Sequence, residues 1–167
     1  MGGGETVALT LASALRKEHE ITFFVRRKVD VNKLETFFDL PLDGIKFKVF
    51  GRLITSLPSF SSFKESLYVR YAYRYFKNYD IIIDTYSNGL FMKEIPQKTI
   101  CYIHFPNYTK QKKGLKAVLN FLLIKEKEMF YYDNIVCNSS FTQGYLTKLT
   151  KKSSQVVYPP VKTGYFY

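Results

Sequence analysis

Polar residues that could bind a ligand or move a proton stand directly after short apolar runs in this sequence. His104 follows the run 101–103, and Pro106 turns the chain two residues later. An imidazole in that place can accept a proton or form a hydrogen bond with a hydroxyl group of a ligand. A lone histidine at the end of a strand can also be a structural residue, so two interpretations of His104 stand side by side.

Two further segments show the same arrangement. Asp84 ends the apolar run 81–83, where it could face a ligand or cap the following loop. Ser139 and Ser140 follow the run 135–137 and stand where a helix is expected to begin. Their hydroxyl groups could line a binding site, and simple capping of the helix explains at least one of them equally well.

Glycines open the chain. Gly3 and Gly4 precede Glu5 and a helical pattern, and glycine lets the backbone approach a ligand closely. A helix N-terminus also attracts negative charge, so these three residues are candidates for contact with a diphosphate or a sugar. A flexible terminus is the competing interpretation, because a glycine run alone is a weak signal.

The elements that must position these residues follow from the spacing of the apolar side chains. We expect helices over residues 5–17, 31–38, 63–77, 115–130 and 140–150, and strands over residues 21–25, 45–50, 80–84, 99–103, 134–137 and 154–158. Strands that alternate with helices predict a parallel sheet covered on both faces. The fold class is therefore α/β, with a Rossmann-like three-layer sheet.

Details of these elements are also predicted. The strand over 80–84 is expected to be central, and the strand over 45–50 is expected at a sheet edge. Ser140 and Gln143 have the spacing of a capping box. A domain of this type normally begins with a strand that feeds a glycine loop, and here the glycines come first. We expect residues outside this sequence, a rearranged strand order or a partner chain to fill the place of that strand.

Composition narrows the class of protein. With 46% hydrophobic and 23% charged residues the chain is globular, and no apolar run reaches the roughly 18 residues of a membrane helix. The net charge of +11 favours contact with phosphates. Cys101 and Cys137 are expected to be buried reduced thiols, with no metal site. No signal peptide is visible, so a cytoplasmic location is expected.

Five segments, taken together, resemble the N-terminal domain of family 4 retaining glycosyltransferases with the GT-B fold. They are GGGET, IIIDTYSNG, CYIHFPNYT, IVCNSSFT and VVYPPV, and they occur in the family's order over nearly the whole chain. The resemblance is closest to the α-1,2-mannosyltransferases that extend dolichol-diphosphate-linked oligosaccharides.

The resemblance implies roles for the candidate residues. His104 corresponds to the strand-end histidine that approaches the transferred sugar, and Gly3 and Gly4 correspond to the glycine loop on the acceptor side. Ser139 and Ser140 correspond to the polar helix start that lines the cleft. It further implies that residues 1–158 form the acceptor-side domain and that 159–167 are a hinge remnant. The nucleotide sugar, the only co-substrate expected, would bind a C-terminal domain absent from this sequence, so we expect no transfer by the chain alone.

Several partners are compatible with this resemblance. A lipid-linked oligosaccharide is the expected acceptor, and basic residues could meet an anionic membrane surface at its cytoplasmic face, or could simply be solvated. These are Arg70, Arg74, Lys77, Lys110, Lys112, Lys113 and Lys116. The alternative function is a non-catalytic module that binds such an acceptor or a partner protein, and a homodimer or a complementary C-terminal half would also fit. Nucleic-acid binding ranks last, because no recognition signature is present.

Overall fold

The computed structural model describes residues 3–25, 27–49, 74–85, 96–104 and 132–161. The chain divides into two compact units, residues 1–55 with 159–167 and residues 56–158. The assignment of residues 1–158 to one acceptor-side domain, with a hinge over 159–167, stays a prediction.

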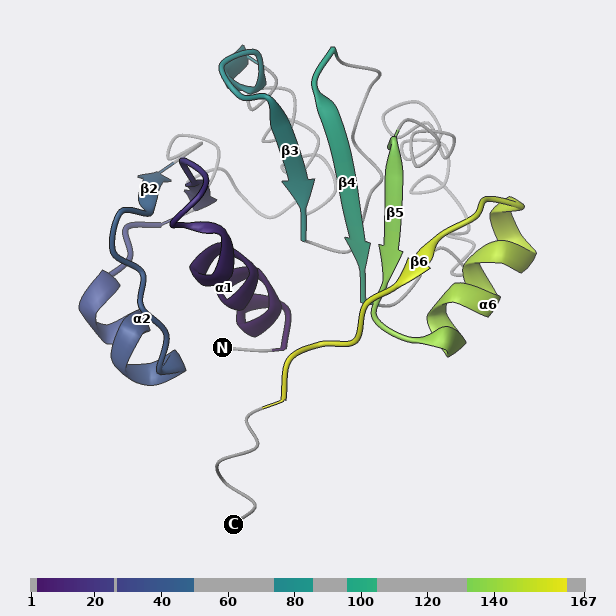
Figure 1. Cartoon of the computed structure of the whole chain (residues 1–167), viewed down its shortest axis with the longest axis horizontal. Coiled ribbons are helices and arrows are strands. Elements are labelled where there is room, and N and C mark those ends of the chain that lie inside the picture. Colours follow the sequence, from purple (N-terminus) through teal and green to yellow (C-terminus); the bar gives the residue numbers. More distant parts are fainter. Residues whose placement is uncertain (1–2, 26, 50–73, 86–95, 105–131, 162–167) are drawn as a thin grey trace, which may run out of the picture. The chain divides into compact units, whose positions relative to one another are not determined.

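The first unit contains two helices and two parallel strands (Figure 1). In chain order they are α1 (Gly3–Leu15), β1 (Thr22–Val25), α2 (Val31–Phe38) and β2 (Lys46–Val49). The two strands pair in parallel with Thr22 opposite Lys46, and the rings of Phe23 and Phe47 stack 5.5 Å apart. These four elements were all predicted, within two residues at each end.

A small apolar core holds the first unit together. Leu9 and Ala12 of α1 join Phe38, Leu42 and Ile45 in one buried cluster. Since residues 9 and 12 are three apart, they lie on the same side of the helix.

The helix α1 begins earlier than predicted. It includes Gly3 and Gly4, so these glycines form its first turn rather than a loop before it. The first N–H groups of a helix have no partner within it, and glycine therefore weakens this turn less than it would weaken the middle of a helix.

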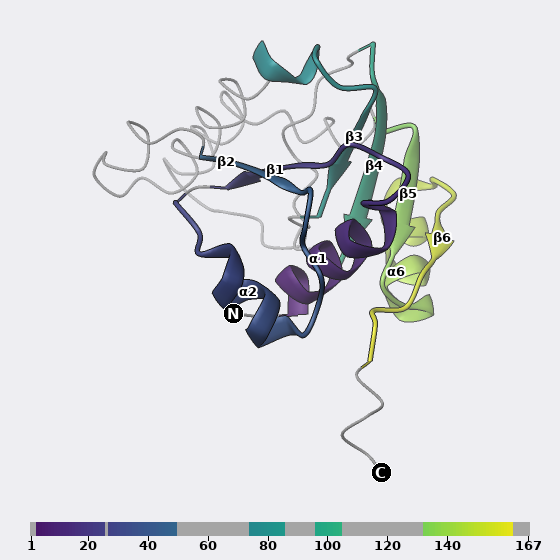
Figure 2. The ribbon, with the colours of Figure 1, turned by 60° about the vertical axis from the view of Figure 1, so that its left-hand side comes forward.

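The second unit is built on a four-stranded parallel sheet with strand order β3-β4-β5-β6. Its elements are β3 (Ile81–Asp84), β4 (Lys98–Ile103), β5 (Asn134–Cys137), α6 (Ser140–Thr150) and β6 (Gln155–Val156). Figure 2 shows the two sheets and their helices from a second direction. Parallel strands alternating with helices confirm the predicted Rossmann-like α/β class.

The order of the strands differs from one prediction about this sheet. Among the described strands β3 stands at one end of the order, not in the middle, and the side chains of Ile81 and Ile83 are 48% and 38% exposed. An apolar run predicts a strand but does not fix its place in the sheet. The helix predicted over 63–77 is described only from residue 74, where 74–76 are helical, and the one over 115–130 lies outside the described residues.

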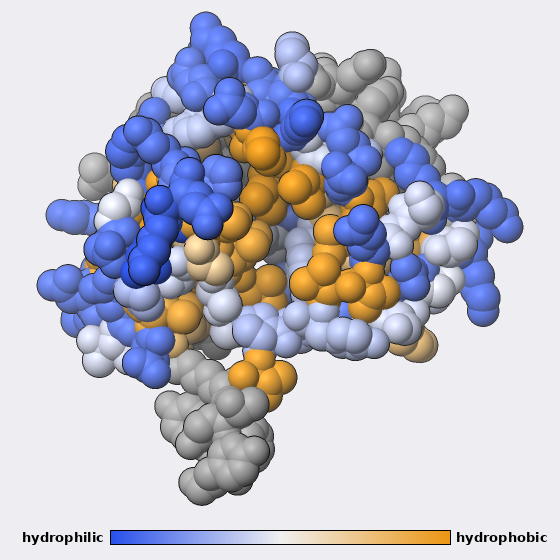
Figure 3. Space-filling model, viewed as in Figure 1, coloured by the Kyte–Doolittle hydropathy of each residue, from blue (hydrophilic) through white to orange (hydrophobic). Residues whose placement is uncertain are grey.

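The two faces of the four-stranded sheet differ. On one face Cys101, Ile103 and Cys137 are buried with Leu146 of α6, and Ile82 packs against them. Side chains alternate between faces along a strand, so Ile81, Ile83 and Tyr102 belong to the opposite face. Hydrophobic residues are visible at the surface near the middle of the space-filling view (Figure 3).

Both cysteines are free and buried, as predicted. Burial raises the pKa of Cys101 far above its ordinary value, and the nearby charge of Asp84 raises it further. Burial also raises the pKa of Cys137. Both groups are therefore protonated thiols at neutral pH, which suits a role in packing.

A set of hydrogen bonds joins the starts of β4 and β5. The carboxylate oxygen Oδ2 of Asp133 accepts bonds from the backbone N–H of Thr99 at 2.7 Å and from its hydroxyl at 2.9 Å. The backbone N–H of Asp133 donates to the same hydroxyl oxygen at 3.0 Å. These bonds, the backbone one first, lower the pKa of Asp133 below its ordinary value.

The start of α6 differs from its prediction. The N-cap is Ser139, whose hydroxyl oxygen accepts a hydrogen bond from the backbone N–H of Thr142 at 3.2 Å. The predicted capping box of Ser140 and Gln143 is wrong, because the side chain of Gln143 donates to the carbonyl oxygen of Ser154 at 2.6 Å instead. With two adjacent serines, either one could be the N-cap. Gln143 bonds to Ser154 and not to the backbone of Ser140, and Ser139 is the cap.

No helix among the described residues is long and apolar enough to cross a membrane. The basic residues at 70, 110, 112, 113 and 116, which were proposed to meet a membrane surface, lie outside the described ranges.

Ser139→Ala should lower the free energy of unfolding by about 1 kcal/mol, the usual cost of losing a serine N-cap. Urea unfolding followed by circular dichroism measures this change. Ser140→Ala is the matched control, and we expect it to change stability by less than about 0.5 kcal/mol, because its hydroxyl is exposed at the surface. An equal loss in both variants would contradict the assignment of Ser139 as the cap.

Asp133→Asn should reduce the loss of unfolding free energy that acidic pH causes. Because the folded-state pKa of Asp133 is lowered, its ionised form stabilises the fold above the unfolded-state pKa of about 3.9. That contribution is lost as the pH falls through the folded-state value. Urea unfolding between about pH 6 and pH 2 should show that the free energy of unfolding falls less steeply with pH in the variant. Thr99→Val removes the hydroxyl donor and should also make the loss shallower. Identical slopes in all three proteins would refute this cause.

Candidate functional site

The carboxyl ends of three parallel strands bring the predicted polar residues of the second unit to one edge of its sheet. Asp84 ends β3, His104 follows β4, and Asn138 and Ser139 follow β5. The arrows of these strands point in the same direction in Figure 1. In open α/β sheets this edge is the usual place for a ligand.

His104 is positioned by two contacts on β4 and α6. Its imidazole ring lies 5.0 Å from the ring of Tyr102, with the two planes at 63°. Its backbone carbonyl oxygen lies 3.5 Å from the hydroxyl of Thr142. The imidazole nitrogen Nε2 is buried and has no hydrogen-bond partner among the residues that the structure describes. Buried polar atoms normally have a partner, so this nitrogen is suited to bond with a ligand.

Asp84 lies at the same edge but on the other face of the sheet. It pairs with Cys101, and Ile82 of the same strand packs into the core beneath α6. Its carboxylate oxygen Oδ2 accepts a hydrogen bond from the hydroxyl of Tyr132 at 2.6 Å. His104 shares the face of Tyr102, so the sheet separates the two side chains. The role of Asp84 in binding an acceptor stays a prediction.

A compact network of hydroxyl and amide groups joins the end of β4 to the start of α6. The hydroxyl of Thr142 donates to the side-chain oxygen of Asn138 at 2.7 Å, and the hydroxyl of Ser139 lies 3.0 Å from that of Thr142. The backbone N–H of Asn138 donates to the carbonyl oxygen of Ile103 at 3.0 Å. Thr142 is only 2% exposed. Ser139 is therefore linked to His104 through a single side chain.

Ser140 occupies a different environment from Ser139. Its hydroxyl lies 3.1 Å from that of Tyr158, beyond the end of β6, and either atom could be the donor. Phe141 and Tyr158 are 72% and 66% exposed, so this side of the helix start faces solvent. The two serines therefore have different roles in the structure. Ser139 caps α6, and Ser140 contacts the chain that follows β6.

Gly3, Gly4 and Glu5 belong to the first unit, in the first turn of α1. A side chain added at Gly3 would meet nothing within 4 Å, so local packing among the described residues does not require glycine there. Their contribution to a site with His104 stays a prediction.

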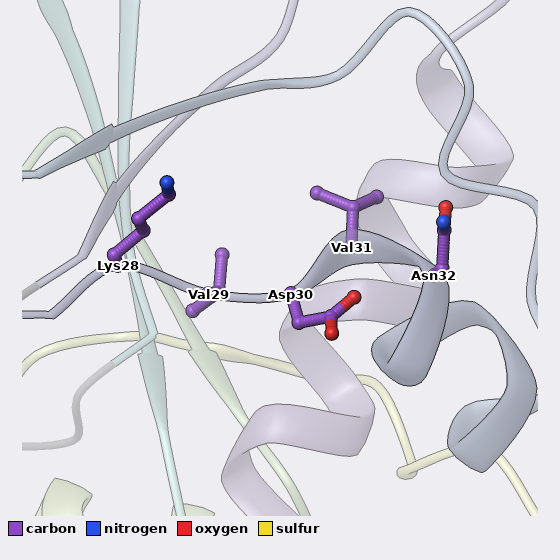
Figure 4. Close-up of a pocket in the computed structure, with 5 residues that line it drawn as sticks. All are labelled: Lys28, Val29, Asp30, Val31 and Asn32. Atoms are coloured by element: carbon purple, nitrogen blue, oxygen red, sulfur yellow. The ribbon is translucent and has the colours of Figure 1, made fainter.

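The first unit has a shallow pocket of its own. A hollow of about 500 Å³ lies between β1 and α2 and is lined by Lys28, Val29, Asp30, Val31 and Asn32 (Figure 4). Asp30 is already engaged as the N-cap of α2, where it accepts a hydrogen bond from the backbone N–H of Lys33. None of the predicted site residues lines this pocket. The described residues also contain no cluster of histidine, cysteine or carboxylate side chains that could hold a metal ion.

Sequence reasoning overlooked Tyr102, Tyr132 and Thr142. Each contacts a candidate residue through its side chain, and the partners are separated by up to 48 residues in sequence. The one available signal was the position of Thr142, three residues after the serine that caps the helix.

Comparison with known proteins gives a single assignment. Residues 1–165 match the family model described as Glycosyltransferase Family 4. No curated protein and no solved structure matches the chain. The match covers nearly all of the 167 residues, including both units and every candidate residue. The chain therefore belongs to Glycosyltransferase Family 4.

Proposed function

We propose that this chain is the acceptor-side part of a retaining enzyme that transfers a sugar, with mannose as the first candidate, from a nucleotide donor to a lipid-diphosphate-linked oligosaccharide. The observation that carries the proposal is the buried Nε2 of His104 at the carboxyl edge of the sheet, which has no partner within the described ranges, in a chain of family 4. The choice of mannose and of a lipid-linked acceptor rests on the resemblance of the five sequence segments.

His104 is the proposed catalytic residue. Its imidazole can donate a hydrogen bond to a sugar hydroxyl or steady charge that develops during transfer. The Tyr102 contact restrains the ring, and the bond from Asn138 N–H to Ile103 restrains the backbone just before it, so the group would meet a substrate in one orientation. A group held in advance in this way does not have to reorganise when the substrate reacts.

The acceptor would be held by polar groups at helix starts and at the end of β3. The start of α6 lies beside His104, and its N-terminal dipole favours a negatively charged group such as a diphosphate. Ser139, Ser140, Asp84, Gly3, Gly4 and Glu5 remain the proposed acceptor and diphosphate contacts. The nucleotide sugar would be held by a second, donor-binding domain, and we propose that transfer requires both domains.

A peripheral position at an anionic membrane surface fits an acceptor with a lipid tail. The net charge of +11 would draw the chain toward acidic headgroups. Of the basic residues proposed for this contact, Arg74 and Lys77 lie within the described residues, and both are exposed.

His104→Ala should lower transfer by about 100-fold or more, the usual contribution of a positioned acid or base. The measurement follows labelled sugar from a panel of nucleotide sugars, beginning with GDP-mannose, onto a lipid-diphosphate-linked oligosaccharide. It is made on the polypeptide that carries this chain together with a donor-binding domain. The control is His19→Ala, at an exposed position in the first unit. Full activity of His104→Ala would refute the catalytic assignment.

Vesicles containing phosphatidylserine should bind the chain more tightly than vesicles of phosphatidylcholine alone, and salt should weaken the difference. The double variant Arg74→Glu and Lys77→Glu should reduce the preference, whereas Lys33→Glu on α2 should alter it less. Cosedimentation with liposomes provides the measurement. Equal affinity for neutral and anionic vesicles would rule out the membrane contact.

A further inference from the structure

Tyr102 makes two contacts that point in different directions. Its ring packs against the imidazole of His104 at a centroid distance of 5.0 Å. Its hydroxyl donates a hydrogen bond to the backbone carbonyl oxygen of Val157 at 2.8 Å. The side chain is only 6% exposed, and burial raises the pKa of its hydroxyl, so the hydroxyl is a proton donor at neutral pH.

The contact with Val157 spans the width of a strand. Tyr102 on β4 stands opposite Val136 on β5, and Val136 in turn stands opposite Gln155 on β6. The side chain therefore crosses β5 to reach the residue that follows β6. The backbone N–H of Val157 also donates to the carbonyl oxygen of Cys137 at 3.0 Å, so Val157 is tied to both β5 and β4.

Within the described part of the chain, the imidazole of His104 has few other constraints. Its Nε2 has no partner there, and Thr142 lies near the backbone carbonyl rather than the ring. An edge-to-face contact such as the one with Tyr102 is directional, so it can set the angle of the imidazole. The bond from the tyrosine hydroxyl to Val157 restrains in turn the position of the tyrosine ring.

We propose that Tyr102 is a positioning residue that couples the imidazole of His104 to the chain leaving β6. Val157 and Tyr158 are 52% and 66% exposed. The carbonyl oxygen that binds the buried Tyr102 therefore belongs to a segment at the surface. A displacement of that segment shifts the carbonyl oxygen that Tyr102 holds, and the ring and the imidazole turn with it. The value of this coupling for transfer rests on the proposed role of His104, whereas the coupling itself does not.

The test uses the chain as it is and reads the histidine side chains by NMR at one fixed pH. The sequence has only two histidines, and the exposed His19 in the other unit serves as an internal reference. In Tyr102→Phe, which keeps the ring and removes the hydroxyl, the ring-proton signals of His104 should shift and broaden while those of His19 stay in place. In Tyr102→Leu the ring-current shift of His104 should be lost.

Tyr158→Phe is the matched control. It removes a hydroxyl from the same surface segment but not the one bonded to Val157, and both histidines should keep their signals. Unchanged His104 signals in Tyr102→Phe would overturn the link to Val157, and unchanged signals in Tyr102→Leu would overturn the ring contact as well. Backbone amide spectra confirm that each variant is folded.

An activity measurement separates this inference from the proposed function. If both are right, Tyr102→Phe lowers kcat for transfer and leaves KM nearly unchanged, because the substrate still binds. If His104→Ala keeps full transfer while Tyr102→Phe shifts the His104 signals, the coupling stands and the catalytic role of His104 falls. If Tyr102→Phe changes neither the signals nor kcat, the coupling is overturned.

Discussion

The pairing of β4 with β5 is the constraint on which the candidate site depends. Because the two strands run parallel and in register from Ile100 opposite Asn134, the residues that follow each strand arrive together at one edge. The bond from the N–H of Asn138 to the carbonyl of Ile103 extends this pairing past the last strand residue. The start of α6 is thereby delivered beside His104, and the hydroxyl network can form only because the backbones are already adjacent.

Much of this arrangement could be predicted from the sequence. The bounds of α2, β5 and α6 match the predicted ranges. Asp30 stands before α2 and caps it, and the apolar run of β5 ends two residues before Ser139, which caps α6. That His104 and Ser139 share an edge followed from the parallel topology alone. The choice of Ser139 over Ser140 as the cap did not, because it depends on the bond between Gln143 and Ser154, which only the folded chain makes.

The orientation of the site's side chains could not be predicted from the sequence. Asp84 and His104 both end apolar strands, yet the sheet separates them, because a strand that ends one residue earlier or later presents its last side chain to the opposite face. The contacts of Tyr102 and Tyr132 reach across neighbouring strands and connect residues 55 and 48 positions apart. No local pattern encodes such contacts. Those across the sheet are set by strand order and register, which a single sequence specifies only indirectly.

The two buried cysteines provide a way to measure the opening of the four-stranded sheet. Cys101 and Cys137 lie on neighbouring central strands and are 1% and 0% exposed. A thiolate is the reactive form of cysteine, and both thiols are held protonated and out of contact with water. A thiol reagent added from outside can modify them only while these strands are parted from the helix that covers them. The rate of thiol labelling therefore measures how often this unit opens, and no probe has to be added to the chain.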